Sequence, residues 1–307
     1  MTYSIVGRDP EREELGIAVQ SRYFAVGRVV PWIEAGVGVI ASQSFANPVY
    51  GLEGLRMLRA GFEPDRILKT LLDQDAGAAT RQVAILDAGG RRAVHTGSRC
   101  VAAAGHALGE NCCAQANMMT QSTVWAAMVR AFENAPGDLA DRLLAALTAA
   151  EQEGGDVRGK QAAALVVVST KRPDQLPSDR SIDLRVDDHA DPLGELKRLL
   201  DYSRAHRLAN RAIASLLAND PSGALADIEA CCAACPSEPE FLFRRCLILL
   251  QLGHVDEAHE ALHQAHSIHP GWSELLLRFA DAGVLPVSRE KLEFLVADLR
   301  HSGAEGP

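Results

Sequence analysis

The residues best suited to chemistry stand at the start of the chain, where Thr2 directly follows Met1. Threonine is small enough for methionine aminopeptidase to remove the residue before it, which would leave Thr2 with a free α-amine. Such an amine has a pKa of about 7.7–8.0 and is partly neutral near pH 7. It can then accept the proton of the hydroxyl on the same residue while the hydroxyl oxygen attacks a carbonyl. The sequence therefore predicts that Thr2 is an N-terminal nucleophile.

The residues that follow would hold this nucleophile in place, because they alternate in the manner of a β-strand. Tyr3 and Ile5 would lie on one face, and Thr2, Ser4 and Val6 on the other. A strand that is paired from its first residue keeps that residue at a fixed position, which a frayed terminus does not.

Polar side chains at the predicted ends of other strands supply the remaining candidates. Amide N–H groups can stabilise the oxyanion that forms in acyl transfer, and Asn117 and Gln43 are the residues predicted to do so. We expect residues 115–117 to lie in a loop before a helix. The residues predicted to bind or orient the substrate are Ser21, Asn47, Arg81, Gln82 and His95.

Three other chemistries have weaker support in the sequence. A cysteine nucleophile would use Cys100 or Cys113 with His95 or His106, although a buried free cysteine is the more common situation. A metal site could use Asp187, Asp188 and His189, but the side chains of three consecutive strand residues cannot all point in one direction. A zinc site could use Cys231, Cys232 and Cys235, but the sequence has no second pair of ligands to complete it. We predict no metal and no cofactor, and no phosphate-binding glycine loop is evident.

The composition narrows the class of protein. At 307 residues with 47% hydrophobic residues, the chain is long enough for two domains with real cores. A net charge of -9 argues against nucleic acid or an anionic membrane as the main partner. We expect no apolar run long enough for a membrane helix and no secretory leader. Seven scattered cysteines favour a reducing compartment, so we predict a cytoplasmic protein.

Residues 1–204 predict an α+β domain in which pairs of helices separate groups of strands. Because paired helices do not fit single βαβ crossovers, we expect a four-layer αββα sandwich of two antiparallel sheets with helices outside. The expected strands are residues 2–6, 15–20, 36–43, 81–87, 92–95, 161–169 and 182–186, and the expected helices start near residues 52, 64, 123 and 138.

Residues 205–307 predict only helices, with a repeat of 34 residues. The pairs that carry this repeat are Leu208 and Leu242, Ala224 and Ala258, Ile228 and Leu262, Cys231 and Ala265, and Pro236 and Pro270. Small residues at fixed positions with a closing proline resemble tetratricopeptide repeats. We expect Gly253 to lie in the turn between paired helices.

The first 200 residues resemble the domain-of-unknown-function family ten-twenty-eight. The motifs that carry the resemblance are residues 2–6, 25–27, 30–32, 43–48, 50–51, 81–83, 95–97 and 183–189. A family loop with glycine at its second position here reads Gln115, Ala116 and Asn117. The family is grouped with the N-terminal nucleophile hydrolases, so the resemblance implies the αββα fold and hydrolysis of an amide or related C–N bond with Thr2 as nucleophile.

Two functions of different classes follow from these observations. The first is hydrolysis of a small-molecule amide by Thr2. The alternative is a non-catalytic scaffold in which residues 205–300 bind a protein or peptide, or another copy of the chain in a homo-oligomer. An unblocked residue 2 would favour the hydrolase, because a scaffold has no need of it.

Overall fold

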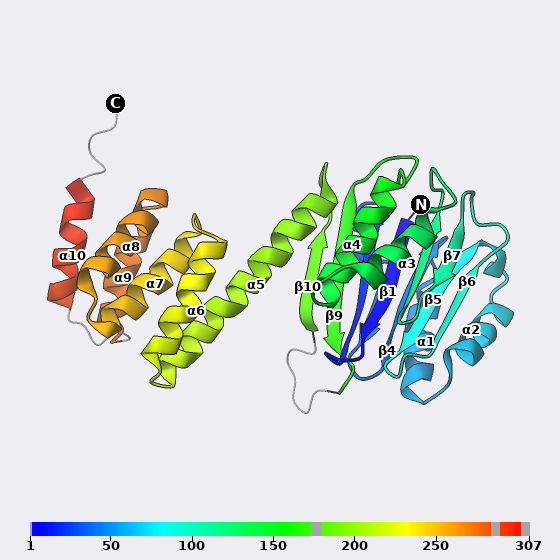
Figure 1. Ribbon diagram of the computed structural model, residues 1–307, viewed down its shortest axis with the longest axis horizontal. Coiled ribbons are helices and arrows are strands. Elements are labelled where there is room, and N and C mark those ends of the chain that lie inside the picture. Colours follow the sequence, from blue (N-terminus) through cyan, green and yellow to red (C-terminus); the bar gives the residue numbers. More distant parts are fainter. Residues whose placement is uncertain (1, 173–179, 284–288, 302–307) are drawn as a thin grey trace. The chain divides into compact units, whose positions relative to one another are not determined.

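The computed structural model describes residues 2–172, 180–283 and 289–301, and Figure 1 shows the order of their elements. The chain divides into two compact units, Met1–Leu200 and Asp201–Pro307. This boundary falls within helix α5, Pro192–Leu217, four residues before the one predicted. The first unit is an α+β region with two antiparallel sheets, and the described part of the second is helical throughout.

The larger sheet has six strands in the order β10-β9-β2-β1-β8-β7, all paired antiparallel. The first strand therefore lies in the interior of this sheet, between β2 and β8. The strands are β1 (Thr2–Asp9), β2 (Glu14–Ser21), β7 (Gly105–Leu108), β8 (Cys112–Asn117), β9 (Ala162–Ser169) and β10 (Arg180–Val186).

The smaller sheet has four antiparallel strands in the order β3-β4-β5-β6. Its strands are β3 (Pro31–Glu34), β4 (Gly38–Ser44), β5 (Arg81–Asp87) and β6 (Arg92–Thr96). The hairpin predicted across residues 88–90 is confirmed as the β5–β6 pair. The inner faces of the two sheets meet where β1 and β2 contact β4 and where β5 contacts β8.

Two helix pairs cover the outer faces of the sheets. Helices α1 (Pro48–Arg59) and α2 (Pro64–Asp73) pack on the four-stranded sheet, and α3 (Val124–Asn134) and α4 (Leu139–Gln152) pack on the six-stranded sheet. Asp138 begins α4 with a reciprocal capping box. One apolar core fills the space between the sheets, and one lies under each helix pair.

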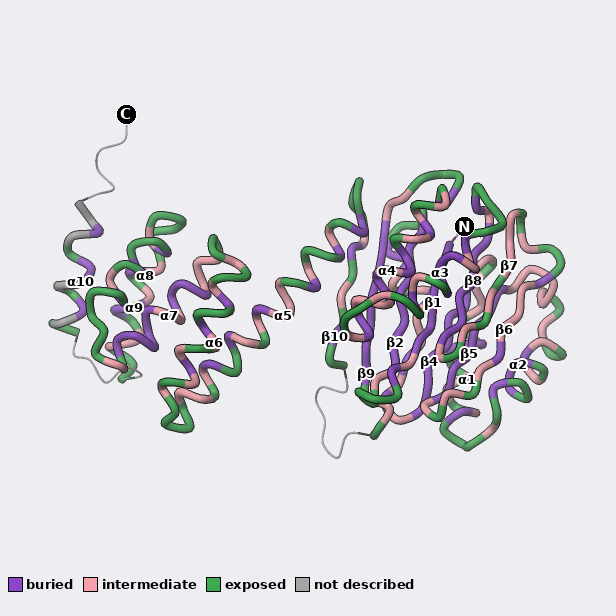
Figure 2. Tube along the Cα trace, in the orientation of Figure 1, coloured by how far each residue is buried: buried purple, intermediate pink, exposed green. Residues whose placement is uncertain are grey.

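Strand β1 alternates as predicted. Tyr3 and Ile5 enter the core beneath α3 and α4, and Val6 enters the core between the sheets. Thr2 and Ser4 share the face of Val6, so the intersheet space becomes polar where the strand begins. Figure 2 shows β1 as buried along its course through the unit.

The second unit carries the predicted repeat in a regular form. Its helices after α5 are α6 (Pro221–Ala234), α7 (Pro239–Leu252), α8 (Val255–Ile268), α9 (Gly271–Asp281) and α10 (Arg289–His301). Helices α6 and α8 begin 34 residues apart. The repeat positions on both helices are fully buried, and they are Ala224, Ile228, Cys231, Ala258, Leu262 and Ala265. Gly253 ends α7 with φ 80° in the predicted turn.

The structure departs from the predicted elements in two places. Residues 115–117 lie in strand β8 and not in a loop, because they pair with the start of β1. Strands β3 and β7 were not expected, since four residues each give too short a pattern to distinguish from a turn. No helix among residues 2–172, 180–283 and 289–301 is long and apolar enough to span a membrane.

Tyr3 anchors the strand that carries Thr2. Its hydroxyl donates to Glu151 Oε1 at 2.5 Å, and burial together with the Glu151 charge holds the pKa of Tyr3 well above its ordinary value. We expect Tyr3→Phe to lower the free energy of unfolding by about 1–2 kcal/mol, because a buried hydrogen bond to a charged acceptor is lost. Urea denaturation at pH 7 measures this change. Tyr23→Phe, at a side chain that is 56% exposed, is the matched control and should leave the midpoint in place; equal midpoints for all three proteins would contradict the anchoring role.

Candidate active site

A layer of polar side chains lies between the two sheets at the end where β1 starts. From the six-stranded sheet it contains two residues of β1, one of β2 and two of β8, and from the four-stranded sheet it contains one residue each of β4 and β5. The members are Thr2, Ser4, Ser21, Gln43, Gln82, Gln115 and Asn117, and all are buried. We call this set the intersheet polar layer. Strand pairing explains it, because Thr2 is opposite Asn117, Ser4 opposite Gln115, and Gln43 opposite Gln82.

The hydroxyl and the carbonyl oxygen of Thr2 both form hydrogen bonds within this layer. Thr2 Oγ1 donates to Ser21 Oγ at 3.1 Å, across the β1–β2 pair. The Thr2 carbonyl oxygen accepts from Gln43 Nε2 at 3.1 Å and from Asn117 Nδ2 at 3.3 Å. Residue 2 is therefore held by side chains from both sheets, and only 6% of it is exposed. Met1, whose removal was predicted, lies outside the described residues.

The amides that hold Thr2 also hold one another. Gln82 Oε1 accepts from Gln43 Nε2 at 2.7 Å and from Asn117 Nδ2 at 2.9 Å. Gln82 Nε2 in turn donates to the Ala116 carbonyl at 2.9 Å and to Thr96 Oγ1 at 3.0 Å. Gln82 thus joins the two sheets, and its side chain fixes the amides that fix Thr2.

Ser4 and Gln115 complete the layer, although neither was among the predicted site residues. Ser4 Oγ donates to Gln43 Oε1 at 2.6 Å, which fixes the rotamer of that amide. Gln115 Nε2 donates to the Ala41 carbonyl at 3.1 Å. Ser4 was identifiable from the strand alternation, since it faces the same way as Thr2. Gln115 lies in the same segment as the predicted Asn117, but only the pairing of β8 with β1 shows that its side chain faces the layer.

A cavity of about 210 Å³ opens beside Thr2. Thr2, Gln43 and Ser44 form its polar end. Ser44 has a left-handed backbone with φ 70°, and its buried Oγ has no hydrogen-bond partner in the structure. Backbone strain and an unpaired hydroxyl next to a candidate nucleophile are features of ligand-binding sites. The remaining lining residues are Tyr23, Val26, Val29, Val30 and Ala46.

The part of the chain that matches known proteins has nearly the same bounds as the first unit of the structure. Residues 2–196 match the model of a family of unknown function, DUF1028. The chain belongs to the DUF1028 family. A solved structure of the family, protein SPO2555 from Silicibacter pomeroyi, is 34% identical and has a TM-score of 0.58; the match covers 65% of this chain and 87% of that one. No curated protein matches the chain.

Two predicted substrate-binding residues of the DUF1028 region do not border the cavity. Arg81 and His95 have the strand parity of Val83, which enters the core under α1 and α2, so both face away from the intersheet polar layer. Arg81 donates to Asp75 Oδ2 at 2.7 Å, and His95 Nε2 lies 3.2 Å from the Ala78 carbonyl. Both residues therefore lie on the opposite face of the four-stranded sheet from the intersheet polar layer.

His106 approaches the layer more closely than His95 does. Its Nδ1 lies 2.9 Å from Thr96 Oγ1, the hydroxyl to which Gln82 donates. Burial, with a smaller effect of His95, lowers the pKa of His106 below its ordinary value. Neutral His106 can therefore accept a hydrogen bond from the Thr96 hydroxyl. The Thr96 oxygen in turn accepts from Gln82, so His106 helps to fix the Gln82 side chain.

Asn47 has a structural task in the DUF1028 region. Its side chain accepts from the Val49 amide at 3.1 Å and caps helix α1, with Pro48 in the first turn. It does not line the cavity, whereas its neighbour Ala46 does. The cap fixes the path of the chain as it leaves β4, so Asn47 supports the cavity wall indirectly.

The triplet at 187–189 also positions a loop. The Asp187 carbonyl accepts from the Ala25 amide at 3.0 Å, and Asp188 Oδ1 accepts from Gln161 Nε2 at 3.0 Å. His189 Nδ1 accepts from the Asp191 amide. The bond from Ala25 holds the segment that begins there and lines the cavity. Among the described residues, no group of three or more His, Cys, Asp or Glu side chains could hold a metal ion.

The cysteines lack the features of a nucleophile. Cys113 is fully buried, and burial raises the pKa of its thiol to about 12. Cys100 Sγ donates to the Arg81 carbonyl at 3.3 Å and does not line the cavity beside Thr2. A thiol is reactive as the thiolate, which burial disfavours. All seven cysteines are free.

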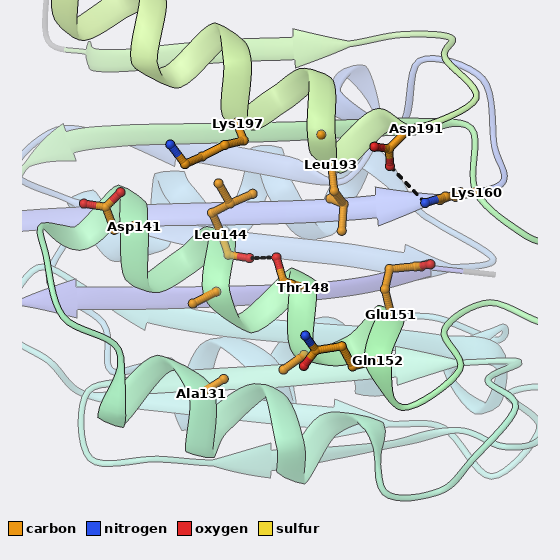
Figure 3. A pocket seen from close by; sticks show the side chains of 13 residues that line it. Ala131, Asp141, Leu144, Thr148, Glu151, Gln152, Lys160, Asp191, Leu193 and Lys197 are labelled. Carbon is orange, nitrogen blue, oxygen red and sulfur yellow. Dashed lines mark hydrogen bonds and ion pairs between the residues drawn. The ribbon is translucent and has the colours of Figure 1, made fainter. Parts of the chain in front are cut away.

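A larger groove of about 690 Å³ lies on the outer face, between α4 and the start of α5 (Figure 3). Its charged side chains bind one another or the core. Lys160 pairs with Asp191 at 2.9 Å, and Glu151 accepts from Tyr3. Tyr3 faces this side of the sheet and Thr2 faces the other, so the groove and the candidate nucleophile are separated by the sheet.

The Asp75–Arg81 pair predicts a pH dependence of stability. The Arg81 guanidinium donates to Asp75 and holds the pKa of that carboxyl well below its usual range. A depressed folded-state pKa contributes stability above the unfolded value of about 3.9, and that contribution is lost as the pH falls. We expect Asp75→Asn to cost about 2 kcal/mol at pH 7, with the difference from wild type shrinking below about pH 4.

Urea denaturation between pH 3 and pH 7 tests this expectation. Asp73→Asn is the matched control, since Asp73 forms an exposed pair with Lys69 and should contribute almost nothing. A cost for Asp75→Asn that is constant with pH would contradict the assignment of the pair as the source of the stability.

Proposed function

We propose that the DUF1028 region is an N-terminal nucleophile hydrolase that cleaves an amide or related C–N bond of a small molecule. The observation that carries the proposal is the position of Thr2: its hydroxyl and carbonyl are fixed in the intersheet polar layer, beside a cavity of about 210 Å³. A terminal residue that served only to begin a strand would need neither the amides around it nor a cavity in front of it.

The layer order supports the same proposal. Helix pair, sheet, sheet and helix pair follow one another by contact, which is the order of the αββα sandwich of N-terminal nucleophile hydrolases. Fold likeness alone does not assign an activity, because one fold serves many functions. The argument therefore depends on the residues at Thr2.

Removal of Met1 would give Thr2 an α-amine that needs hydrogen-bond acceptors. Asn117 Oδ1 is buried without a partner, and Asn117 is the strand partner of Thr2. An acceptor beside the new amine would orient its lone pair toward Thr2 Oγ1. In the proposed reaction the amine takes the hydroxyl proton, Thr2 Oγ1 forms an ester with the acyl group, and the amine of the substrate leaves with that proton. Water then hydrolyses the ester.

The two amides predicted as oxyanion donors receive a different part in this proposal. Gln43 Nε2 and Asn117 Nδ2 donate to the Thr2 carbonyl and to Gln82, so they position the nucleophile residue.

We expect Thr2→Ala to abolish hydrolysis of small amides in a chain that still folds, because the change removes only the hydroxyl and methyl groups of one side chain and costs about 1–2 kcal/mol of stability. Thr2→Ser should retain a measurable fraction of kcat. Intact-mass analysis should find Met1 absent in all three active-site forms, since Ala and Ser are also small. Full activity in protein that retains Met1 would rule out the free-amine mechanism, and unchanged turnover in Thr2→Ala would remove Thr2 from the account.

A second function concerns the helical unit. We propose that it binds a protein or peptide in the manner of tetratricopeptide repeats, on the observation that six small or aliphatic repeat positions are fully buried in register on α6 and α8. This function is compatible with the first. If it is the only one, the Thr2→Ala chain and the wild type will capture the same partner and neither will hydrolyse an amide library.

A further inference from the structure

The residues that line the cavity beside Thr2 indicate which kind of ligand it can bind. Eight residues line it, and none of their side chains is an acid, a base or a histidine. Val26 and Val30 are core residues, 1% and 2% exposed, and with Val29 they form an apolar wall opposite the polar end. A charged group placed in such a cavity would lose its hydration, and no lining side chain would offer it an opposite charge.

The apolar wall is held rigidly. The Ala25 amide donates to the Asp187 carbonyl, the Val30 amide to the Val26 carbonyl, and the Ser42 amide to the Val30 carbonyl. These bonds tie the wall to strands of both sheets. The wall therefore has a fixed shape, which can select a ligand by size.

A second support comes from helix α1. Trp32 Nε1 donates to the Val29 carbonyl at 3.2 Å, and the Trp32 ring packs directly on Gly51. A Cβ at Gly51 would lie only 2.0 Å from that ring, so glycine is required for the ring to reach its place. The position of Val29 thus depends on the contact between the Trp32 ring and Gly51.

The volume limits the size of the ligand. An apolar cavity of about 150 Å³ accommodates benzene, so a cavity of about 210 Å³ admits a group of roughly six to nine non-hydrogen atoms. Tyr23, 56% exposed, lies at the rim, where a larger leaving group can remain in solvent. The buried part of the substrate is therefore its acyl part.

The mechanism adds a reason against an acidic ligand. A carboxylate close to the α-amine of Thr2 would favour the protonated amine and raise its pKa. The amine could then no longer accept the hydroxyl proton.

We propose that the cavity binds a small, uncharged, branched or linear aliphatic acyl group of about four to six carbons, with its chain on the wall of Val26, Val29 and Val30. This inference rests on the proposed hydrolase function and names its substrate class.

The test is a series of N-acyl p-nitroanilides hydrolysed by the full chain. We expect kcat/KM to rise about fourfold for each added carbon up to 4-methylpentanoyl, as burial of a CH₂ group predicts. Decanoyl should react poorly because it exceeds the cavity. Succinyl has the shape of 4-methylpentanoyl but bears a carboxylate, and it should react at least 100-fold more slowly. Equal rates for these two anilides would overturn the inference.

Variants locate the effect in the cavity. Val29→Phe should shift the preferred chain to two or three carbons, whereas Val157→Phe, at a residue that is 57% exposed and outside the cavity lining, should leave the preference unchanged. A length preference that does not respond to Val29→Phe would place the acyl group elsewhere.

Binding to the Thr2→Ala chain separates failure of the inference from failure of the hydrolase function. Ligand-detected NMR with 4-methylpentanamide and succinamate measures the cavity without catalysis. Binding of the neutral amide alone, without hydrolysis by the wild type, supports the ligand class and overturns the hydrolase. Thr2-dependent hydrolysis with a preference for succinyl overturns the ligand class and keeps the hydrolase. Absence of both binding and hydrolysis overturns both.

Discussion

The first unit depends on one constraint, which is that the carbonyl of residue 2 must find donors inside the space between two sheets. Gln43 and Asn117 provide them, one from each sheet, and Gln82 holds both amides. An unsatisfied buried carbonyl or amide costs about 1–3 kcal/mol, so the residues of this layer fix one another in a single arrangement. Thr2 is thereby held by side chains from both sheets.

Strand alternation divides the tasks between the faces of the sheets. The inner faces carry the intersheet polar layer and the cavity. The outer faces carry charged and hydrogen-bonded pairs that fasten helices to the sheets, such as Tyr3 with Glu151 and Arg81 with Asp75. The strands that line the cavity are thus fixed by contacts on the outer faces of the sheets. The site can keep its geometry while the side chains that line it remain available to a ligand.

Much of this arrangement was predictable from the sequence, and the remainder had physical reasons to be missed. The alternation of residues 2–6 placed Thr2 and Tyr3 on opposite faces, and Gln43 and Gln82 were selected as polar residues near the ends of predicted strands. Asn117 was selected as a polar residue of a predicted loop, and the structure places it in strand β8. Arg81 and His95 were assigned to the site because pattern alone does not say which face of a strand meets the other sheet. The wall at Val26, Val29 and Val30 had no signal, since valines read only as core.

The central claim is that the hydroxyl of Thr2 is the reacting group of this protein. An electrophilic β-lactone with a short aliphatic chain tests it directly, because ring opening by the nucleophile leaves a covalent ester that peptide mass spectrometry can locate. The account predicts one adduct per chain, on Thr2, in a peptide that begins with residue 2. An adduct on Cys100 or another cysteine with Thr2 unmodified would contradict it.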